Sequence, residues 1–416
     1  MSRISEKIRL LAAECETELK DVFARFDKVS VANTEKILNV FYELGLAERH
    51  FCPTNGYGYN DDGRDLCDRA FAMAMGCEYG FVRHNIVSGT HALGIGLFAL
   101  LRPGDSMISV AGKPYDTLDG VIGINGAGEP GCLAEFGVSY KQIDLIDGKS
   151  LDYEAIEEAL KSDSSIKVVF VQRSKGYLNR ASLSASEISE LYDRVKALSK
   201  AFVVIDNCYG EFCEENEPKG DLLIGSLIKN PGGGIAETGA YLVGTKEAVE
   251  LAAARLTVPG IGLECGASLG QTRNMFKGLF FAPHTVCQAL KTAAFASLLF
   301  QKLGYTVSPT FDEERRDIIQ TVSLGNAELL CAFCRGLQSG SPVDSYATPE
   351  PWDMPGYSDA VIMAAGAFTQ GSSLELSADA PLRAPYTVFM QGGLTYESGR
   401  FGIMCAAEEC EKAKLN

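Results

Sequence analysis

Three parts of the sequence place chemically active residues beside segments that predict buried strands. Ser88-Gly89-Thr90 follows a short apolar run and opens a helical stretch, so its hydroxyl and backbone N–H groups predict a helix start that holds a phosphate. Asp206 ends the apolar run 201–205, which puts a carboxylate at the carboxyl end of a strand. Lys229 lies between an apolar segment and a glycine-rich turn, which predicts a partly buried lysine.

Each of these groups has a plain structural alternative when it is taken alone. Ser and Thr often cap helices, a strand-end Asp can cap a loop, and most lysines are solvated on the surface. Taken together, a phosphate-binding turn, a buried carboxylate and a half-buried lysine are what pyridoxal phosphate chemistry requires. The lysine forms a Schiff base, and the acid partners the pyridine nitrogen. The sequence therefore predicts pyridoxal 5'-phosphate as the cofactor.

Motifs for other chemistries lack the residues that would have to accompany them. Ser226 and Lys229 have the SxxK spacing of penicillin-binding acyl-enzymes, but no Ser-Asp-Asn or Lys-Thr-Gly motif occurs in the chain. The four histidines lack zinc-ligand spacing. Cys331 and Cys334 form a lone CxxC pair within an apolar helical pattern. We therefore expect no metal site.

The charge balance excludes several kinds of partner. The chain has 54 acidic and 38 basic residues and a net charge of −16, so it repels nucleic-acid backbones and anionic lipid surfaces. The longest nearly apolar run, 92–101, is about half of a bilayer span, and the N-terminal segment has no signal-peptide core. Thirteen scattered cysteines fit a reducing compartment. We expect a cytoplasmic protein with a small-molecule substrate and neither nucleic acid nor membrane as partner.

Apolar periodicity divides the chain into three parts. Spacings of three and four residues predict a helix over 4–26 and another over 37–44, which form an N-terminal helical arm, 1–60. The large domain, 61–285, alternates helical stretches with strand-like runs, which predicts a mostly parallel sheet flanked by helices. Its expected strands are 85–87, 106–110, 168–171, 202–205 and 241–243. A helix over 284–304 leads into a small α+β C-terminal domain, 286–416, with expected strands 360–363 and 386–389.

At these residues the chain resembles fold-type I pyridoxal phosphate enzymes, and more closely the methionine gamma-lyase-like family often labelled aluminium resistance protein. The stretches that carry the resemblance extend along nearly the whole chain: 56–59, 63–65, 83–92, 171–174, 206–211, 226–234, 278–284 and 385–397. The resemblance implies an α/β fold like that of aspartate aminotransferase. It also implies a carbon–sulfur lyase, of methionine gamma-lyase or cystathionine lyase type, that releases a thiol, a 2-oxo acid and ammonia from a sulfur-containing amino acid.

The resemblance further implies how the cofactor is held. Lys229 would bind it covalently and later move a proton, while Asp206 would keep its ring nitrogen protonated. Tyr115 would stack on the ring, and Gln172, or alternatively Arg173, would contact the O3' oxygen. The residues implied to hold the phosphate are Ser88, Gly89, Thr90 and Ser226.

Substrate binding and assembly are also implied. Arg383, or alternatively Arg400, would bind the substrate carboxylate through its guanidinium group. In related lyases a tyrosine and an arginine near the arm reach the neighbouring subunit's phosphate, which makes Tyr59 and Arg64 candidates, and Tyr59 also a candidate for substrate binding. We expect a homodimer at minimum and a homotetramer as the assembled form. The alternatives are an aldolase, a cysteine desulfurase, an aminotransferase or a non-catalytic binding protein of the same fold.

Overall fold

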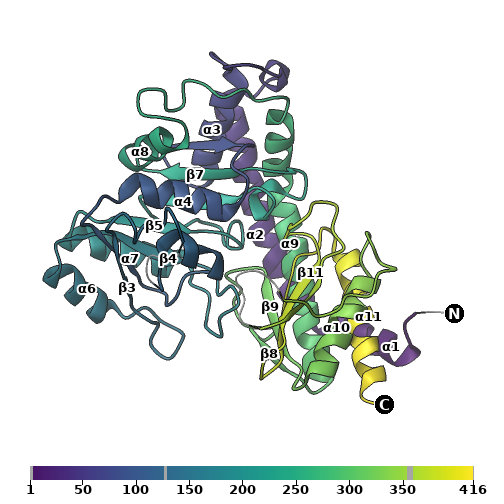
Figure 1. Cartoon of the computed structure of the whole chain (residues 1–416). Helices are drawn as coiled ribbons and strands as arrows, with labels where there is room; N and C mark the ends of the chain where they lie inside the picture. The colour runs from purple at the N-terminus through teal and green to yellow at the C-terminus, as the bar shows by residue number, and fades with distance from the viewer. Residues whose placement is uncertain (1–2, 126–128, 354–358, 416) are drawn as a thin grey trace.

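The computed structural model describes residues 3–125, 129–353 and 359–415, and within these ranges it has two lobes built on separate sheets (Figure 1). The arm consists of α1 (Glu6–Glu18) and α2 (Lys20–Leu44), which meet at the fully buried Leu19. The expected helices over 4–26 and 37–44 are therefore wrong in their limits. The apolar face of α2 is interrupted by Asn33, which is buried because its side chain donates to the Glu214 carbonyl at 3.0 Å.

The large sheet has seven strands, and only β7 runs against its neighbours, so the expectation of a mostly parallel sheet is confirmed. Most expected strands agree with the structure to within two residues, but the one over 85–87 is wrong. The strand in this region is β1, which begins six residues before the expected start. Val87 is exposed in the segment between β1 and the next helix. In spatial order the strands are β1 (Tyr79–Arg83), β7 (Ala240–Gly244), β6 (Leu222–Ser226), β5 (Phe202–Asp206), β4 (Ile166–Gln172), β2 (Ser106–Ser109) and β3 (Ser139–Gln142).

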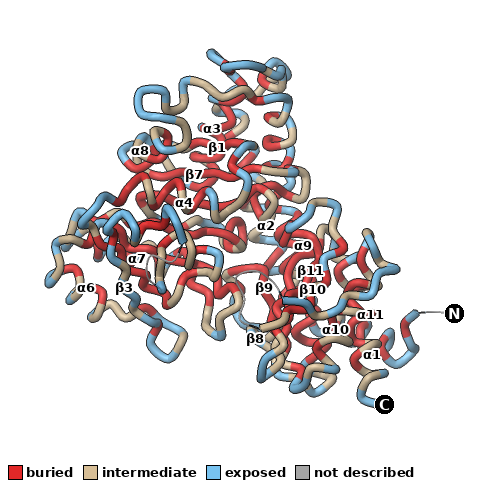
Figure 2. The backbone as a smooth tube through the Cα atoms, in the orientation of Figure 1, coloured by how far each residue is buried: buried red, intermediate tan, exposed pale blue. Residues whose placement is uncertain are grey.

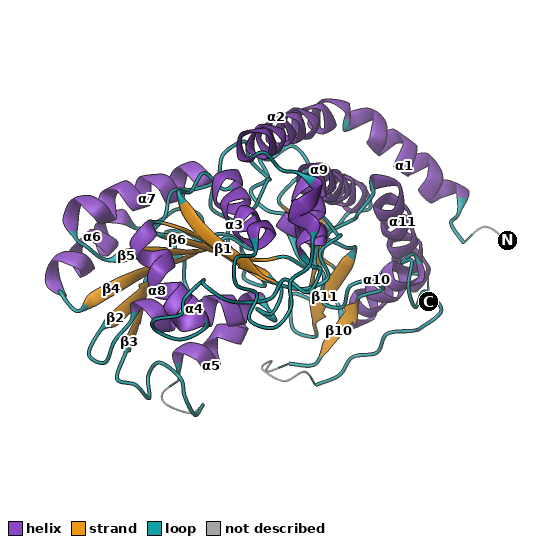
Figure 3. Ribbon diagram, turned by 90° about the horizontal axis from the view of Figure 1, so that it is seen from above, coloured by secondary structure: helices purple, strands orange, loops and turns teal. Residues whose placement is uncertain are grey.

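Helices cover both faces of this sheet (Figure 3). One face carries α4 (Gly89–Leu100), α5 (Asp119–Ile122) and α8 (Lys246–Leu256), and the other carries α3 (Asp62–Ala74), α6 (Tyr153–Ser162) and α7 (Ala185–Leu198). Strand residues alternate between two apolar clusters, so Phe170 and Val204 pack toward α4 whereas Val171 and Val203 pack toward α7. The same alternation sends Gln172, Asp206 and Ser226 to the α4 face.

The second sheet is antiparallel and lies in the smaller lobe. Its strands, in spatial order, are β10 (Val361–Ala364), β11 (Ser377–Pro381), β12 (Thr387–Gln391), β9 (Ile319–Ser323) and β8 (Thr306–Ser308). Helices α10 (Ala327–Ser339) and α11 (Tyr396–Ala413) pack on each other beside this sheet. Short 3₁₀ turns occur at η1 (Glu48–Phe51), η2 (Asp116–Leu118) and η3 (Asn230–Gly232).

A single helix, α9 (Thr272–Lys302), joins the two lobes. It packs against α2 and α3 at one end and against α11 and β9 at the other, and most of its residues are buried (Figure 2). The helix expected over 284–304 begins twelve residues earlier. It continues through Pro283, a residue type that normally ends or kinks a helix. The domain limit expected at 285 therefore falls within a continuous helix. Within the described residues, no helix is both long and apolar enough to cross a membrane.

Candidate active site

The candidate site lies where the carboxyl ends of β4, β5 and β6 face the N-terminus of α4, the position in which open α/β sheets bind ligands. A cavity of about 220 Å³ opens there. Eight of the ten residues predicted to hold the cofactor line it: Ser88, Gly89, Thr90, Tyr115, Gln172, Asp206, Ser226 and Lys229. The rest of the lining consists of Leu93, Thr117, Ser174, Gly176, Cys208, Tyr209, Ile228 and Gly371.

Lys229 and Asp206 form the charged centre of the cavity. The Lys229 Nζ atom lies 4.0 Å from the centroid of the Tyr209 ring, a cation–π contact that fixes the end of the side chain. Burial raises the pKa of the Asp206 carboxyl, and the charge of Lys229 opposes that rise. Burial by itself lowers the pKa of Lys229, but Cys208, Tyr209 and Asp206 more than offset it, so the pKa of Lys229 lies above its ordinary value.

The donors needed to bind a phosphate lie at the start of α4. The Ser88 hydroxyl caps this helix by accepting the His91 N–H at 3.0 Å, so the first N–H groups of the helix stay available to a ligand. The hydroxyls of Thr90 and Thr117 are 2.7 Å apart. The Ser226 hydroxyl is buried and has no hydrogen-bond partner. A buried hydroxyl with no partner beside a helix N-terminus fits the phosphate of pyridoxal phosphate.

Tyr115 and Gln172 line the part of the cavity nearest Gly176. A Cβ atom on Gly176 would lie 3.2 Å from both the Tyr115 ring and Gln172 Nε2, and Gly176 has a φ of +54°. Gln172 Nε2 donates to the Ser174 carbonyl at 2.9 Å, while Gln172 Oε1 is buried without a partner. Glycine therefore leaves room for an aromatic ring and an amide to face the same ligand.

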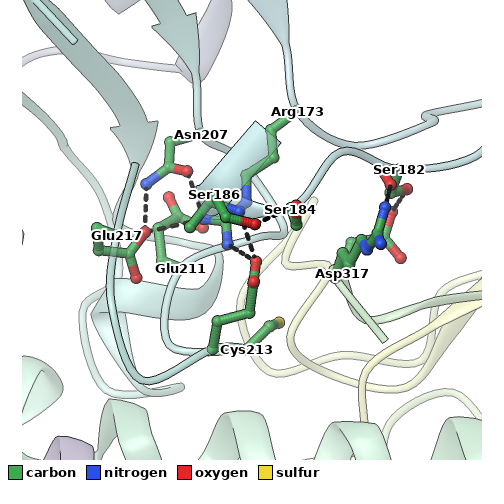
Figure 4. Close-up of polar contacts among 12 residues, drawn as sticks. Arg173, Ser182, Ser184, Ser186, Asn207, Glu211, Cys213, Glu217 and Asp317 are labelled. Carbon is green, nitrogen blue, oxygen red and sulfur yellow. Dashed lines mark hydrogen bonds and ion pairs between the residues drawn. The ribbon is translucent and has the colours of Figure 1, made fainter. Parts of the chain in front are cut away.

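Arg173, the alternative to Gln172, does not line the cavity, and its guanidinium group lies among acidic and amide side chains (Figure 4). Its guanidinium group is fully buried and pairs with Glu214 at 2.6 Å and Glu217 at 2.9 Å. It also donates to Asn207 Oδ1 at 2.8 Å. This expectation is wrong for Arg173 because the side-chain period of two turns it away from the cavity.

Neither arginine expected to bind the substrate carboxylate lines the cavity. Arg383 is 54% exposed, and its Nη1 lies 3.3 Å from Asp359. Arg400 pairs with Glu16 of α1 at 2.8 Å. In this structure each guanidinium group is engaged elsewhere, in the smaller lobe and the arm, so a role for either arginine in binding the substrate carboxylate stays a prediction. Within the described lining of the cavity, Lys229 is the single cationic side chain.

The two residues expected to reach a neighbouring subunit behave differently. Arg64 is buried, and its Nη1 donates to the carbonyls of Gly58 at 2.7 Å and Gly266 at 3.0 Å within its own chain. These bonds hold two loops of one chain together, and contact of Arg64 with a neighbouring subunit's phosphate stays a prediction. Tyr59 is 60% exposed and stacks on Tyr57 with ring centroids 5.5 Å apart, so its ring lies on the surface.

Some residues of the cavity were not predicted from the sequence. Tyr209 is the most important, because its ring supports the Lys229 ammonium group. A signal exists, since Tyr209 follows Asp206 by three residues and has a φ of 72°, a strained value that marks functional loops. Thr117, in η2, and Gly371, in a loop, belong to segments with no pattern that points to the site. Within the described residues, no group of three or more His, Cys, Asp or Glu side chains can hold a metal ion.

Known proteins match this chain over nearly its whole length. The sequence profile of the methionine gamma-lyase family matches residues 8–411. An uncharacterized protein of Bacillus subtilis (strain 168), YnbB, is 44% identical over 99% of this chain and 98% of its own.

Solved structures agree as well. A carbon–sulfur lyase involved in aluminium resistance from Clostridium novyi NT has a TM-score of 0.94 and 46% identity, covering 98% of this chain and 96% of that one. A proposed cystathionine beta-lyase involved in aluminium resistance from Clostridium acetobutylicum has a TM-score of 0.94 and 45% identity, with the same coverage. The pyridoxal-5'-phosphate-dependent protein YhfS from Escherichia coli is 14% identical, covers 94% of this chain and 97% of its own, and has a TM-score of 0.59. That likeness shows the expected fold. The chain belongs to the methionine gamma-lyase family.

Proposed function

We propose that this protein is a pyridoxal phosphate-dependent lyase that cleaves a carbon–sulfur bond of a sulfur-containing amino acid. The products would be a thiol, a 2-oxo acid and ammonia. The observation that carries the proposal is one cavity in which Lys229, Asp206 and a hydroxyl-rich helix start face the same space. The relatives described as lyases support the reaction class.

Different groups around the cavity would contact different parts of the cofactor. Asp206 would pair with the ring nitrogen, and Tyr115 would pack on the ring. The unpartnered Ser226 hydroxyl would meet the phosphate together with the start of α4. When bound, pyridoxal phosphate supplies an aldehyde for covalent attachment and a ring that stores the electrons of a carbanion.

Lys229 has the position to move protons within the cavity. Its Nζ atom is held against the Tyr209 ring, so it can take a proton from the α-carbon of a bound amino acid. It must first lose its own proton, although its pKa is raised. Pairing of Asp206 with the ring nitrogen would remove the carboxylate that stabilises the ammonium form. Cofactor binding is thereby coupled to the activation of the lysine.

The substrate side of the cavity has no arginine within the described residues. Because Lys229 is used in catalysis, we infer that the substrate carboxylate meets neutral donors of the lining or a group from a second chain. Tyr57 and Tyr59 are exposed aromatic residues, and Leu269, on a loop bonded to Thr54, is 61% exposed. This apolar surface supports a homodimer, which we propose pairs into a homotetramer.

The acidic net charge and the free cysteines support a cytoplasmic location. Burial raises the pKa of several of these thiols, such as that of Cys15 to about 12, which keeps them protonated. A reducing compartment would maintain this state. Fluorescence of a tagged chain after cell fractionation would test the location.

Borohydride reduction with pyridoxal phosphate, followed by peptide mass spectrometry, tests the attachment site. We expect a pyridoxyl group on the Lys229 peptide and none in Lys229→Ala. In a separate assay, unreduced protein loaded with pyridoxal phosphate that releases 2-oxo acid, ammonia and thiol from cystathionine or methionine would support the lyase. Transfer of the amino group to an added 2-oxo acid without thiol release would contradict it, and a protein that takes up no cofactor would contradict both steps.

A further inference from the structure

A second carboxyl group lies behind the cavity, on the α7 face of the sheet. Glu211 is fully buried, and its Oε1 accepts the Tyr241 hydroxyl at 3.0 Å. The room for this carboxyl comes from Gly225, since a Cβ there would clash with Glu211 Oε1 and the Tyr241 ring. Gly225 precedes Ser226, whose hydroxyl points into the cavity. Glu211 is thus separated from the cavity by the backbone of β6.

The loop that carries Glu211 is fastened to the residue after Lys229. The Asn230 side-chain amide donates to the carbonyls of Tyr209 at 3.0 Å and Glu211 at 2.9 Å. Tyr209 in turn contacts the Lys229 ammonium group. A change in the charge of Glu211 therefore acts on a lysine held by the same short loop.

No cation pairs with Glu211 among the described residues. Arg173 is engaged by Glu214 and Glu217, and Glu217 also accepts from the Asn207 amide at 2.9 Å (Figure 4). Glu211 Oε2 is buried without a donor. An ionised carboxylate in such a place is strongly unfavourable, because it lacks both solvent and a counter-ion.

We propose that Glu211 is a neutral carboxylic acid at neutral pH and acts as a positioning residue for Lys229. While it is neutral, Asp206 alone provides the carboxylate on the cavity side, and Lys229 can lose its proton when the cofactor engages Asp206. If Glu211 ionises, its charge holds Lys229 as an ammonium ion. The role for Lys229 rests on the function proposed above, whereas the protonation state of Glu211 does not.

The electrostatic surroundings agree with this assignment. Burial raises the pKa of Glu211 to about 8, and the charge of Glu217 adds to the rise, while the backbone N–H of Glu211, the Tyr241 hydroxyl and Lys229 oppose it. The titratable and charged groups that face Glu211 come from four elements: Glu217, Cys208 and Cys213 on its own loop, Tyr241 on β7, Lys229 after β6, and Arg173 at the end of β4.

Thermal unfolding of the full-length protein tests the protonation state. An unfolded glutamic acid loses its proton near pH 4.5, whereas folded Glu211 keeps it to about pH 8, so the folded state binds one more proton between these values. Stability due to Glu211 is complete below pH 4.5 and falls as the pH rises to 8. Glu211→Gln keeps the shape and removes the titration. We expect its Tm relative to wild type to rise steadily between pH 5 and 8.

Glu217→Gln is the matched control, because it breaks the ion pair with Arg173. It should lower Tm throughout the pH range of the experiment, the opposite of the expectation for Glu211→Gln. If Glu211→Gln also lowers Tm at pH 6, Glu211 is ionised and the proposal is overturned. A constant Tm difference between Glu211→Gln and wild type across the pH range would overturn it as well.

Acylation of Lys229 in the full-length chain freed of cofactor tests the coupling. Acetic anhydride labelling, read by peptide mass spectrometry, should proceed at the same rate in wild type and Glu211→Gln at pH 6. At pH 9 the variant should react about threefold faster or more, as a half-unit fall in the pKa of Lys229 implies. Equal rates at both pH values would show that Glu211 does not act on Lys229. Neither thermal unfolding nor acylation requires cofactor attachment. A failure of the proposed function can therefore be distinguished from a failure of the proposal for Glu211.

Discussion

The Ser226 hydroxyl gives opposite effects on stability and on ligand binding. It is 1% exposed and has no hydrogen-bond partner among the described residues, so it is poorly satisfied without a ligand. Ser226→Ala should raise the free energy of unfolding of the cofactor-free protein by about 1 kcal/mol. The same change should weaken pyridoxal phosphate binding about tenfold to hundredfold, the value of one hydrogen bond to a charged group. Thermal melts and fluorescence titration measure the two effects.

Ser109 provides the control for this prediction. Its hydroxyl is also fully buried, but it donates to the Gly112 carbonyl at 2.6 Å. Ser109→Ala should therefore lower stability by about 1 kcal/mol and leave cofactor affinity unchanged. If Ser226→Ala destabilises the cofactor-free protein as Ser109→Ala does, the hydroxyl is structural and not a phosphate ligand.

Asp206 is expected to act through its charge. Burial raises the pKa of its carboxyl, and the Lys229 charge opposes the rise. Replacing the carboxyl with an amide removes the anion that would face the ring nitrogen. Asp206→Asn should lower kcat/KM by at least about a hundredfold, the scale for losing one preorganised electrostatic group. Steady-state kinetics with cystathionine measures this effect.

Asp221 is the control that distinguishes a catalytic role of the Asp206 charge from a loss of folding stability. It is also buried, and it pairs with Lys196 at 2.5 Å at the far end of β6. Asp221→Asn should lower Tm, while the turnover of the folded fraction stays near wild type. A comparable loss of kcat/KM in both variants would mean that Asp206 acts through stability.

The lysine-bearing turn and α9 approach each other closely. A Cβ on Gly278 of α9 would lie 2.4 Å from the Gly232 carbonyl oxygen, which belongs to the backbone and cannot move aside. Alanine normally stabilises a helix relative to glycine by about 1 kcal/mol. Gly278→Ala should instead destabilise by about 1–3 kcal/mol and weaken cofactor binding, because it pushes the turn away from the sheet.

Gly94 of α4 is the comparison for this prediction, because the nearest atom to its Cβ is 3.9 Å away. Gly94→Ala should stabilise the chain by about 1 kcal/mol. Urea unfolding of both variants measures the sign of each change in the free energy of unfolding. Equal stabilisation by both substitutions would show that α9 and the turn are not in tight contact.

The sequence pattern predicts elements well where one face is uniformly apolar. The central strands β4 and β5 are apolar on both faces and were predicted nearly to their ends. The strands β9 and β11 contain buried polar residues such as Gln320 and Asp379, and β1 lies at the sheet edge, so all three lack that signal. Their burial depends on partners distant in the chain, which no local pattern shows.

The candidate site shows the same division. Asp206 is the last residue of β5, Ser88 directly precedes α4 and Lys229 directly precedes η3, so their positions follow from the topology of the sheet. Tyr59 and Arg383 lie in loops whose direction depends on packing. The sequence could suggest their chemistry, but not that Arg383 pairs with Asp359.

At the scale of the whole molecule, the described lining of the cavity has a single cationic side chain, and an exposed aromatic loop lies outside the cavity. In this structure the loop 57–59 does not contribute to the cavity of its own chain, because Tyr59 is 60% exposed and does not line that cavity. A twofold dimer can bring this loop of one chain to the cavity of the other. Light scattering should then give at least twice the chain mass of 44.7 kDa.

A mixed dimer distinguishes a shared site from a merely dimeric one. Lys229→Ala and Tyr59→Ala should each be nearly inactive as homodimers. In a heterodimer with one copy of each, one cavity carries both lesions, while the other combines Lys229 of one chain with Tyr59 of its partner. Differently tagged chains purified as the heterodimer should therefore recover about half of wild-type activity. If Tyr59 serves its own chain, each cavity keeps one lesion and no activity returns.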